Sequence, residues 1–505
     1  MACLYCYHFL VENNLFKKLG QLFFVGFEGY FLSKETRLFL KKIQPGGVIF
    51  FECNIKDKRQ VKNLINEIKE CLEIKPFIAI DQEGGSVERL RKICTSVPSP
   101  WGLAKLGLKE LLTAQKIIAE ELLELGFNMN LGPILDINSN FANPIIGSRS
   151  ISANPKIVSE YGSQIINLYL KHNIIPVAKH FPGHGDLNTD SHLSLPVLSK
   201  TKTELSNFEL IPFKKAIQNK VPVIMVGHIQ LPEIEKEKKS PASLSKNVLQ
   251  GLLRNTLGFK GLIITDELNM KGVTKNYTLS MASYKAIKSG ADMVLFNFQE
   301  KPTLKAFEYV KRICSKNKKL LTRVEESYKR ILSIKNRFSH AKSRNTQPRS
   351  TTVNKKIASN LANKVVHWIK KDLFFLPVRK NEPIEIIYPV TQKLRNEDLE
   401  RILKELKIKK YNLINYKLNP DFESIKNVLN KVKTKKKKIL ITYNVASKKM
   451  QKNLINLLLD KYSDLIVISA GLEHDLEIVP RIKNFISAYS PNYVSLLAAF
   501  NKLLS

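Results

Sequence analysis

The sequence is poor in several features that mark specialised protein classes. Its 505 residues include only six cysteines, and no run of about 18 apolar residues occurs in the chain. The scarcity of cysteine argues against a disulfide scaffold and favours free thiols in a reducing compartment. The absence of a long apolar run predicts that no helix spans a membrane. The cysteines are Cys3, Cys6, Cys53, Cys71, Cys94 and Cys314.

The amino terminus also lacks a recognisable leader. The opening segment, MACLYCYHFLVENN, has no basic start and no long apolar stretch, so it does not resemble a secretory signal. We therefore expect a cytoplasmic protein. Cys3 and Cys6 form a C-x-x-C pair, but no second pair follows at the spacing of a zinc site. We expect neither a metal nor a cofactor.

Acidic residues are too few to balance the basic ones. The chain has 81 Lys and Arg against 45 Asp and Glu, which gives a formal net charge of +36. Such a surplus attracts polyanions, so a basic nucleic-acid-binding protein is one hypothesis. Most of the basic residues are dispersed, however, and the run Lys435–Lys438 has no aromatic residues among its lysines. We favour a generally Lys-rich surface and expect no nucleic acid partner.

Short apolar segments alternate with longer amphipathic ones through the first two thirds of the chain. Eight predicted strands separated by predicted helices indicate a TIM-type (β/α)8 barrel. A doubly wound sheet would usually have a Gly-rich phosphate turn after its first strand, and none is present. The predicted strands are Leu22–Phe27, Gly47–Phe51, Phe77–Ile80, Phe127–Leu131, Ile174–Ala178, Val221–Val226, Gly261–Thr265 and Ala291–Phe296. The predicted helices include Arg59–Leu72, Lys109–Leu125, Pro155–Lys171, Leu205–Gln218, Lys246–Leu257 and Arg323–Arg337.

A polar segment separates this part of the chain from the rest. SHAKSRNTQPRSTTVN lacks apolar periodicity, which is typical of a linker. The strand and helix alternation then resumes over about 150 residues, which is enough for a smaller α/β sandwich domain. We predict a barrel domain over residues 1–338, a linker over 339–354 and a second domain over 355–505. The predicted strands of the second domain are Glu385–Tyr388, Tyr411–Ile414, Ile439–Thr442 and Leu465–Ser469.

Polar residues follow most of the predicted barrel strands. Active sites of such barrels lie at the carboxyl ends of the strands. Any one of these residues could be a helix cap or a structural hydrogen-bond partner, but their recurrence after so many strands predicts a site at this end. They are Asp81 and Glu83 after the third strand, Asp136 and Arg149 after the fourth, Lys179 and His180 after the fifth, His228 after the sixth, and Asp266 and Glu267 after the seventh.

The loop that begins at His180 contains three histidines and two aspartates before it ends at His192. This content first suggests a metal site. Pro182 and the glycines around it interrupt any helix, so His180 and His184 do not share a helical face, and a metal is not favoured. We expect His184 to hydrogen-bond a backbone group instead.

Asp190 stands two residues before His192. A carboxylate so placed can accept a hydrogen bond from one imidazole nitrogen and raise the basicity of the other. Such a histidine can act as a general acid and then as a general base near neutral pH. Asp266 ends an apolar strand, where a neighbouring cation would keep it ionised and able to act as a nucleophile. The alternative for Asp266 is a cap on the helix that follows.

These segments together resemble glycoside hydrolase family 3, in its bacterial β-N-acetylglucosaminidase subgroup. Lys179–His192 matches the specific signature K-H-F-P-G-H-G-x4-D-S-H of that subgroup. The resemblance covers roughly residues 16–340, and it implies a TIM barrel with a glycosidase site. The supporting segments are Gly20-Gln21, Gly46–Phe50, Asp81–Gly85, Asn143–Gly147, Pro241–Ser245 and Ile264–Asp266.

The resemblance implies a role for each matching residue. Asp266 corresponds to the nucleophile that forms a glycosyl-enzyme, His192 to the acid/base, and Asp190 to its partner. The residues that correspond to contacts of the terminal sugar are Asp81, Arg89, Arg149, Lys179 and His180.

The implied activity is that of a retaining exo-β-N-acetylglucosaminidase. Its substrate would be a small carbohydrate, such as a peptidoglycan-derived muropeptide with a terminal N-acetylglucosamine. A β-N-acetylglucosaminide phosphorylase and a β-glucosidase of the same family are the alternatives. Adjacent Asp266 and Glu267 could also orient an acetamido group, but neighbouring side chains on an extended chain point to opposite faces. We therefore favour direct attack by Asp266.

Three positions depart from the pattern of this family. Ser86 stands where the family often has Arg, and Ile151 stands where an aromatic residue is common. His228 lies in M-V-G-H, close to the M-x-x-H of the family, and receives no role. These departures affect the sugar pocket and leave the catalytic matches in place.

Overall fold

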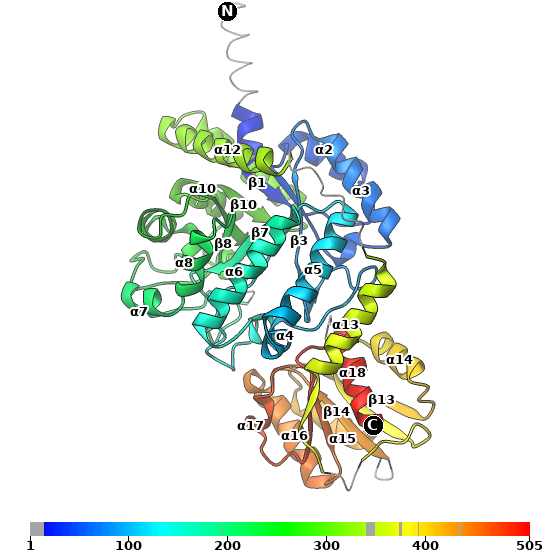
Figure 1. Ribbon diagram of the computed structural model, residues 1–505. Helices are drawn as coiled ribbons and strands as arrows, with labels where there is room; N and C mark the ends of the chain where they lie inside the picture. Colours follow the sequence, from blue (N-terminus) through cyan, green and yellow to red (C-terminus); the bar gives the residue numbers. More distant parts are fainter. Residues whose placement is uncertain (1–14, 192, 340–348, 373–375, 392, 434–435) are drawn as a thin grey trace, which may run out of the picture.

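The computed structural model describes residues 15–191, 193–339, 349–372, 376–391, 393–433 and 436–505. They form a larger part from the first two thirds of the chain and a smaller part from the last third (Figure 1). Helix α13, Thr351–Val365, runs beside both parts. Among the residues described, no helix is both long enough and apolar enough to cross a membrane.

Eight parallel strands close into a barrel in the larger part, as the sequence predicts. Neighbouring strands pair in the order β1-β10-β9-β8-β7-β6-β3-β2. Nearly all of their residues are buried, because helices cover the outside of the barrel and side chains fill its interior. The strands are β1 Phe23–Val25, β2 Gly47–Phe50, β3 Phe77–Ile80, β6 Met129–Asn130, β7 Ile175–Phe181, β8 Val223–Val226, β9 Leu262–Glu267 and β10 Met293–Phe296.

The helices around the barrel begin where capping residues precede amphipathic segments. Helix α6, for example, begins at Pro155 after Asn154, whose side chain accepts a hydrogen bond from the Lys156 backbone N–H. The α-helices of this part are α2 Lys34–Ile43, α3 Lys58–Cys71, α4 Pro100–Leu106, α5 Leu108–Leu125, α6 Pro155–Lys171, α7 Lys202–Asn207, α8 Ile211–Gln218, α9 Lys271–Thr274, α10 Leu279–Ser289, α11 Glu300–Cys314 and α12 Lys318–Ser339. Short 3-10 turns occur at Glu52–Asn54, Gly147–Arg149 and Ala242–Leu244.

Two predicted helices differ from the structure. The single helix predicted over Leu205–Gln218 is divided into α7 and α8, since Phe208 leaves the helical conformation and Pro212 suits the first turn of a new helix. The helix predicted over Lys246–Leu257 is a π-helix, Asn247–Thr256. A short antiparallel pair, β4 Gln82–Gly84 and β5 Val87–Glu88, also follows β3 and was not predicted.

The smaller part is an α/β sandwich around one six-stranded sheet, in the order β11-β16-β15-β14-β12-β13. Helices α14 and α18 pack on one face, and α15 and α16 on the other. The predicted strands are present, whereas β11 and β16 were not predicted. Strand β11 is a partly exposed antiparallel edge strand, and β16 is a short buried strand beside it. The elements are β11 His367–Lys370, β12 Ile384–Val390, α14 Asn396–Glu405, β13 Tyr411–Lys417, α15 Phe422–Lys431, β14 Lys437–Thr442, α16 Lys449–Lys461, β15 Ile466–Ser469, α17 Asp475–Ile478, β16 Asn484–Ser487 and α18 Tyr493–Leu504; a 3-10 turn lies at Val445–Ser447.

Helix α13 joins the two parts and begins within the segment predicted as a linker. The Asn354 side chain donates a hydrogen bond of 3.2 Å to Glu121 in α5. Gly102 in α4 allows the closest approach, because a Cβ atom there would lie 2.5 Å from a methyl carbon of Val365. The second domain is therefore packed on the barrel beside its third and fourth strands, and this contact depends on tertiary structure.

A buried carboxylate near the start of β10 organises the opposite end of the barrel. Asp292 is fully buried and lies 2.5 Å from Arg254, 2.8 Å from Arg323 and 3.1 Å from Arg330. Asp292→Ala is expected to lower the free energy of unfolding by about 3–5 kcal/mol, because it leaves buried guanidinium groups without their partner. Urea unfolding measures this loss. Asp421→Ala, at the exposed start of α15, is the control, and its loss should be much smaller. An Asp292 variant as stable as the control would contradict the prediction.

Glu88 joins the two domains through a shared hydrogen-bond cluster. Its carboxylate accepts hydrogen bonds from Ser96 Oγ (2.5 Å), from the Val97 backbone N–H (2.8 Å) and from Asn492 Nδ2 (3.3 Å), which precedes α18. Burial raises the pKa of Glu88 to about 7, against the opposing effects of these donors and of Arg91.

This pKa predicts a pH-dependent stability. Between pH 4.5 and about 7 the folded protein holds a proton on Glu88 that the unfolded chain has released. The stabilisation is therefore complete below pH 4.5 and is lost as the pH rises through about 7. The free energy of unfolding of Glu88→Gln, relative to that of the wild type, should be higher at pH 8 than at pH 5, by up to about 3 kcal/mol. If the difference in the free energy of unfolding between Glu88→Gln and the wild type were the same at both pH values, the raised pKa of Glu88 would be contradicted. Glu204→Gln is the control: hydrogen bonds to the Thr201 backbone and side chain lower the pKa of Glu204, so this acid titrates below pH 4.5 and the difference from the wild type should be nearly the same at pH 5 and pH 8.

Candidate active site

The polar residues predicted to follow the strands lie at one end of the barrel. Asp81 directly follows β3, Lys179 and His180 are among the last residues of β7, and Asp266 lies near the end of β9. Since all barrel strands run parallel, these ends meet on the same face. Strands β3 and β9 are four places apart in the closed order of eight, so Asp81 and Asp266 approach this face from opposite sides.

Lys179 is the centre of an ion-pair cluster on the β3 side. Its ammonium nitrogen lies 2.6 Å from Asp81 Oδ1 and 2.9 Å from Glu83 Oε1. Arg149 binds the same Glu83 carboxylate through two nitrogens, at 2.8 and 2.9 Å. Arg89 reaches Asp81 at 4.0 Å. Four of the five predicted sugar contacts therefore lie together.

The charges in this cluster support one another. Burial by itself would raise the pKa of Glu83, but Arg149 and Lys179 outweigh it and hold this pKa far below its usual range. Burial would likewise lower the pKa of Lys179, yet Asp81 and Glu83 keep it above its ordinary value. Both groups are therefore charged at neutral pH, which leaves a rigid set of charged donors and acceptors facing the end of the barrel.

His180 is held by a buried aspartate, Asp136, from the segment that follows the neighbouring strand β6. Its Nδ1 lies 2.7 Å from Asp136 Oδ2, and its backbone N–H donates a 3.1 Å hydrogen bond to Asp136 Oδ1. The same oxygen accepts the His184 backbone N–H at 2.7 Å. Burial would raise the pKa of Asp136, but His180 and His184 lower it below its ordinary value. Asp136 therefore fixes the ring of His180 and the turn that follows it.

The expectation that the His184 ring bonds a backbone group was wrong. Its Nε2 lies 3.1 Å from Ser191 Oγ, so the ring ties the start of the loop to its far end. Burial lowers the pKa of His184 to about 4, which makes this ring neutral at physiological pH. Gly185 is required beside it, because a Cβ atom there would lie 1.7 Å from the carbonyl oxygen of Ile137.

Asp266 lies half-buried near the end of β9, and its Oδ1 accepts the backbone N–H of Glu267 at 2.8 Å. It does not cap the following helix. Helix α9 begins at Lys271 after Met270, and that position makes no side-chain cap. Both Asp266 and Glu267 belong to the strand, so their side chains leave it toward opposite faces.

The proposed acid/base pair is described only in part. His192 lies outside the described residues, and Asp190 lies in the loop directly before Ser191. The backbone carbonyl of Ser191 accepts the Gly272 N–H at 3.1 Å. Because Gly272 belongs to α9, this contact holds the loop against the segment that follows Asp266. The role of the Asp190–His192 pair stays a prediction.

His228 and Ile151 both make buried contacts within the barrel. The two ring nitrogens of His228 lie 2.7 Å from Ser243 Oγ and 2.9 Å from the backbone carbonyl of Glu267. His228 thus connects β8 to the end of the strand that carries Asp266. Ile151 is buried in the barrel core. Within the described residues, no group of three or more His, Cys, Asp or Glu side chains is arranged to hold a metal ion.

The second domain reaches this end of the barrel, which the sequence did not indicate. Tyr443 lies near enough to Ser86, the position where the family often has Arg, for the serine hydroxyl to affect the pKa of Tyr443. Asn444 packs so close to Gly147 that a Cβ atom on the glycine would lie 3.6 Å from it. Lys393 lies near enough to Arg149 and Arg89 for their charges to affect its pKa.

Two residues of the barrel cluster received no sugar-binding or catalytic role from the sequence. Glu83 and Asp136 were recognised only as polar residues after strands, yet they anchor Arg149, Lys179 and His180. Glu83 stands in the same D-x-E-G-G segment as Asp81, so its position was available from the motif. No sequence signal pointed to the residues of the second domain, because they are far away along the chain.

A closed parallel barrel with charged residues gathered at the carboxyl ends of its strands defines a TIM-barrel enzyme. A family model described as the glycosyl hydrolase family 3 N terminal domain matches residues 14–334. The chain therefore belongs to glycoside hydrolase family 3. This result confirms the predicted family, the predicted barrel and the prediction of a glycoside hydrolase.

Relatives with similar sequences and structures agree with this family. Beta-hexosaminidase A of Pseudoalteromonas piscicida is 30% identical over 392 residues, which cover 72% of this chain and 65% of the relative. The chain thus spans slightly less than two thirds of that protein. A Beta-hexosaminidase of Photobacterium profundum is 34% identical over 270 residues, or 53% of this chain and 79% of the relative. A glycoside hydrolase family 3 beta-N-acetylglucosaminidase from Paenibacillus sp. str. FPU-7 superposes with a TM-score of 0.85 at 29% identity, covering 97% of this chain and 96% of that one.

Proposed function

We propose that this protein is a retaining exo-β-N-acetylglucosaminidase that removes terminal β-linked N-acetylglucosamine. The observation that carries the proposal is the placement of Asp266 across the barrel mouth from the Asp81–Lys179–Arg149 cluster. A sugar bound by its hydroxyls at that cluster would present its anomeric carbon toward Asp266. The similar proteins named beta-hexosaminidase and beta-N-acetylglucosaminidase support the sugar assignment.

In this proposal the ion-pair cluster binds the sugar hydroxyls. Asp81 and Glu83 accept hydrogen bonds, while Arg89, Arg149 and Lys179 donate them. His180, fixed by Asp136, contributes a further contact. Because these groups already hold one another in place, little order is lost when the sugar binds.

The reaction would proceed through two displacements. Asp266 forms a bond to the anomeric carbon as the bond to the leaving-group oxygen breaks, and His192 gives its proton to that oxygen. Water then attacks the glycosyl-enzyme, returns the proton to His192 and releases Asp266. Asp190 would orient the imidazole. The position of Asp266 and Glu267 in the same extended strand supports direct attack over assistance by the acetamido group.

The proposal extends to peptidoglycan-derived muropeptides as substrates, as the resemblance suggests, and to a cytoplasmic location. The test is product analysis on purified cell-wall fragments and on 4-nitrophenyl N-acetyl-β-D-glucosaminide. NMR during the first turnovers should show free N-acetylglucosamine in the β configuration. Sugar 1-phosphate as the main product in phosphate buffer would identify a phosphorylase. Faster cleavage of the β-glucoside would identify a β-glucosidase, and steeply salt-dependent DNA binding without turnover would favour a nucleic-acid-binding protein.

A further inference from the structure

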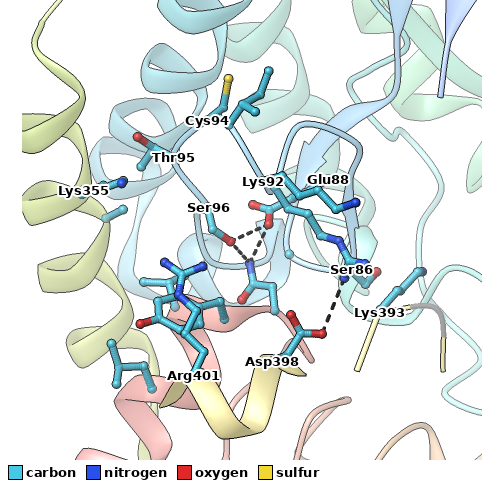
Figure 2. Close-up of a pocket in the computed structure, with 18 of the residues that line it drawn as sticks. Ser86, Glu88, Lys92, Cys94, Thr95, Ser96, Lys355, Lys393, Asp398 and Arg401 are labelled. Atoms are coloured by element: carbon cyan, nitrogen blue, oxygen red, sulfur yellow. Dashed lines mark hydrogen bonds and ion pairs between the residues drawn. The ribbon is translucent and has the colours of Figure 1, made fainter. Parts of the chain in front are cut away.

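A cavity of about 780 Å³ lies between the barrel and the second domain. The segment after β5 lines one side, and α13, α14 and the start of α18 line the others. Figure 2 shows Ser86 and Lys393 at one end of this cavity and Lys355 at the other. Because Arg89 also lines it, the cavity directly adjoins the sugar-binding cluster.

The lining of the cavity has an excess of positive charge. Of the residues that line it, five are acidic and eight are basic. Arg91 engages two of the acids, Glu52 at 2.9 Å and Asp398 at 3.9 Å. Burial raises the pKa of Glu88 to about 7, so this acid is only partly ionised near neutral pH. The basic residues are Arg89, Arg91, Lys92, Lys355, Lys356, Lys393, Arg395 and Arg401.

Two of these cations, Arg89 and Lys393, lie where the cavity meets the ion-pair cluster of the barrel. Arg89 Nε is buried and has no hydrogen-bond partner among the described residues, and its contact with Asp81 is a distant 4.0 Å. The charges of Arg149 and Arg89 act on the Lys393 ammonium more strongly than that of the Glu83 carboxylate, which also lies close by. Burial, with these arginines, lowers the pKa of Lys393 to about 7. Cations held side by side at the edge of a cavity repel one another, and an anionic ligand between them would relieve that repulsion.

The order of the strands in the barrel indicates which part of a bound sugar points toward Arg89 and Lys393. Asp266 attacks from β9, whereas Asp81 and Arg89 belong to the β3 side, four strands away in a ring of eight. In a pyranose ring the anomeric carbon and C4 lie at opposite ends, and the primary hydroxyl on C6 lies beside C4. A sugar with C1 at Asp266 therefore points its C4 and C6 substituents toward Arg89 and Lys393, and its leaving group points away from them.

We propose that Arg89 of the barrel and Lys393 of the second domain form an anion subsite for a phosphate ester on the primary hydroxyl of the terminal sugar. The inference rests on the proposed function and makes it more specific. A phosphate dianion at this point would pair with both cations and occupy the adjoining end of the cavity. Its charge would also keep the Lys393 ammonium protonated in the complex.

The test compares the binding of N-acetylglucosamine and N-acetylglucosamine 6-phosphate by calorimetry, so it does not require turnover. The wild type is expected to bind the 6-phosphate more tightly, on the order of 10- to 100-fold. Lys393→Met should reduce this preference to within about threefold, and Lys393→Arg should keep most of it. Lys355→Met, at the far end of the cavity, is the matched control and should leave the preference as in the wild type. Thermal melts of all variants check that each is folded.

The outcomes separate this inference from the function on which it rests. Equal binding of the two sugars by the wild type would overturn the subsite and leave the glycosidase proposal standing. Binding of neither sugar would overturn both. Inorganic phosphate is the third arm: if it binds the wild type and loses affinity in Lys393→Met, the same subsite accepts a free oxyanion. A phosphate preference that survives Lys393→Met would place the anion elsewhere and refute the role of Lys393.

Discussion

Replacing Asp266 with alanine is expected to lower kcat by about 10⁴-fold or more, because in the proposed mechanism this carboxylate is the nucleophile that forms the glycosyl-enzyme. Asp266 does not cap α9. Its position near the end of β9 places it on the face of the barrel where the other polar residues lie. The melting temperature should change little, since the residue is only half-buried. The measurement is the release of nitrophenol from 4-nitrophenyl N-acetyl-β-D-glucosaminide.

Azide allows the same prediction to be tested by identifying the product that forms. A small anion can occupy the space left by the carboxylate in Asp266→Ala and attack the anomeric carbon as the nitrophenolate leaves. The expected product is the α-glycosyl azide, with faster nitrophenol release than without azide. Glu267→Gln is the control, with an expected loss below about tenfold. If Glu267→Gln loses as much activity as Asp266→Ala, the carboxylate pair orients the acetamido group instead, and direct attack is wrong.

His192 should behave differently from Asp266. His192→Ala is expected to slow the cleavage of a disaccharide far more than that of the nitrophenyl glycoside, because nitrophenolate leaves without a proton. The comparison uses the ratio of kcat/KM values for the two substrates. A uniform loss on both substrates would argue against a role for His192 in protonating the leaving group.

Lys179→Met is expected to produce the second large effect, a loss of about 10²-fold or more in kcat/KM. Lys179 holds Asp81 at 2.6 Å and Glu83 at 2.9 Å, so its removal leaves two carboxylates facing each other in a buried cluster. The pKa values of both acids should rise, and the sugar would lose both a donor and its aligned acceptors. The free energy of unfolding should also fall by about 3 kcal/mol or more, because the paired charges lose their partner.

Lys200→Met provides the matched control for Lys179. Lys200 also bridges two carboxylates, Asp186 at 2.7 Å and Glu209 at 2.5 Å, but it is partly exposed and lies outside the cluster. Its replacement should change kcat/KM by less than about threefold, because neither of its carboxylate partners belongs to the ion-pair cluster. Steady-state kinetics and urea unfolding on both variants separate the two cases. Similar losses in both would mean that Lys179 has no special place in sugar binding.

Much of the fold could be predicted from the sequence because its signals are local. The eight barrel strands are short apolar runs between amphipathic helices, and buried parallel strands produce that pattern directly. Helix α6 coincides with its predicted bounds since Asn154 and Pro155 mark its start. Where local signals are weak, the prediction differs from the structure. The edge strand β11 is partly exposed, so its apolar pattern is weak. The break between α7 and α8 at Phe208 is indicated in the sequence only by Pro212.

The sequence by itself determined the family, the barrel, and the residue types at the strand ends, because these depend on short motifs and on hydrophobic periodicity. Only the tertiary structure decided which of these residues meet. It placed Glu83 between Arg149 and Lys179, assigned Asp136 to His180, and tied His184 to Ser191. It also brought Lys393 of the second domain beside Arg89. Contacts between residues hundreds of positions apart depend on how the domains pack, and no local pattern in the chain encodes that geometry.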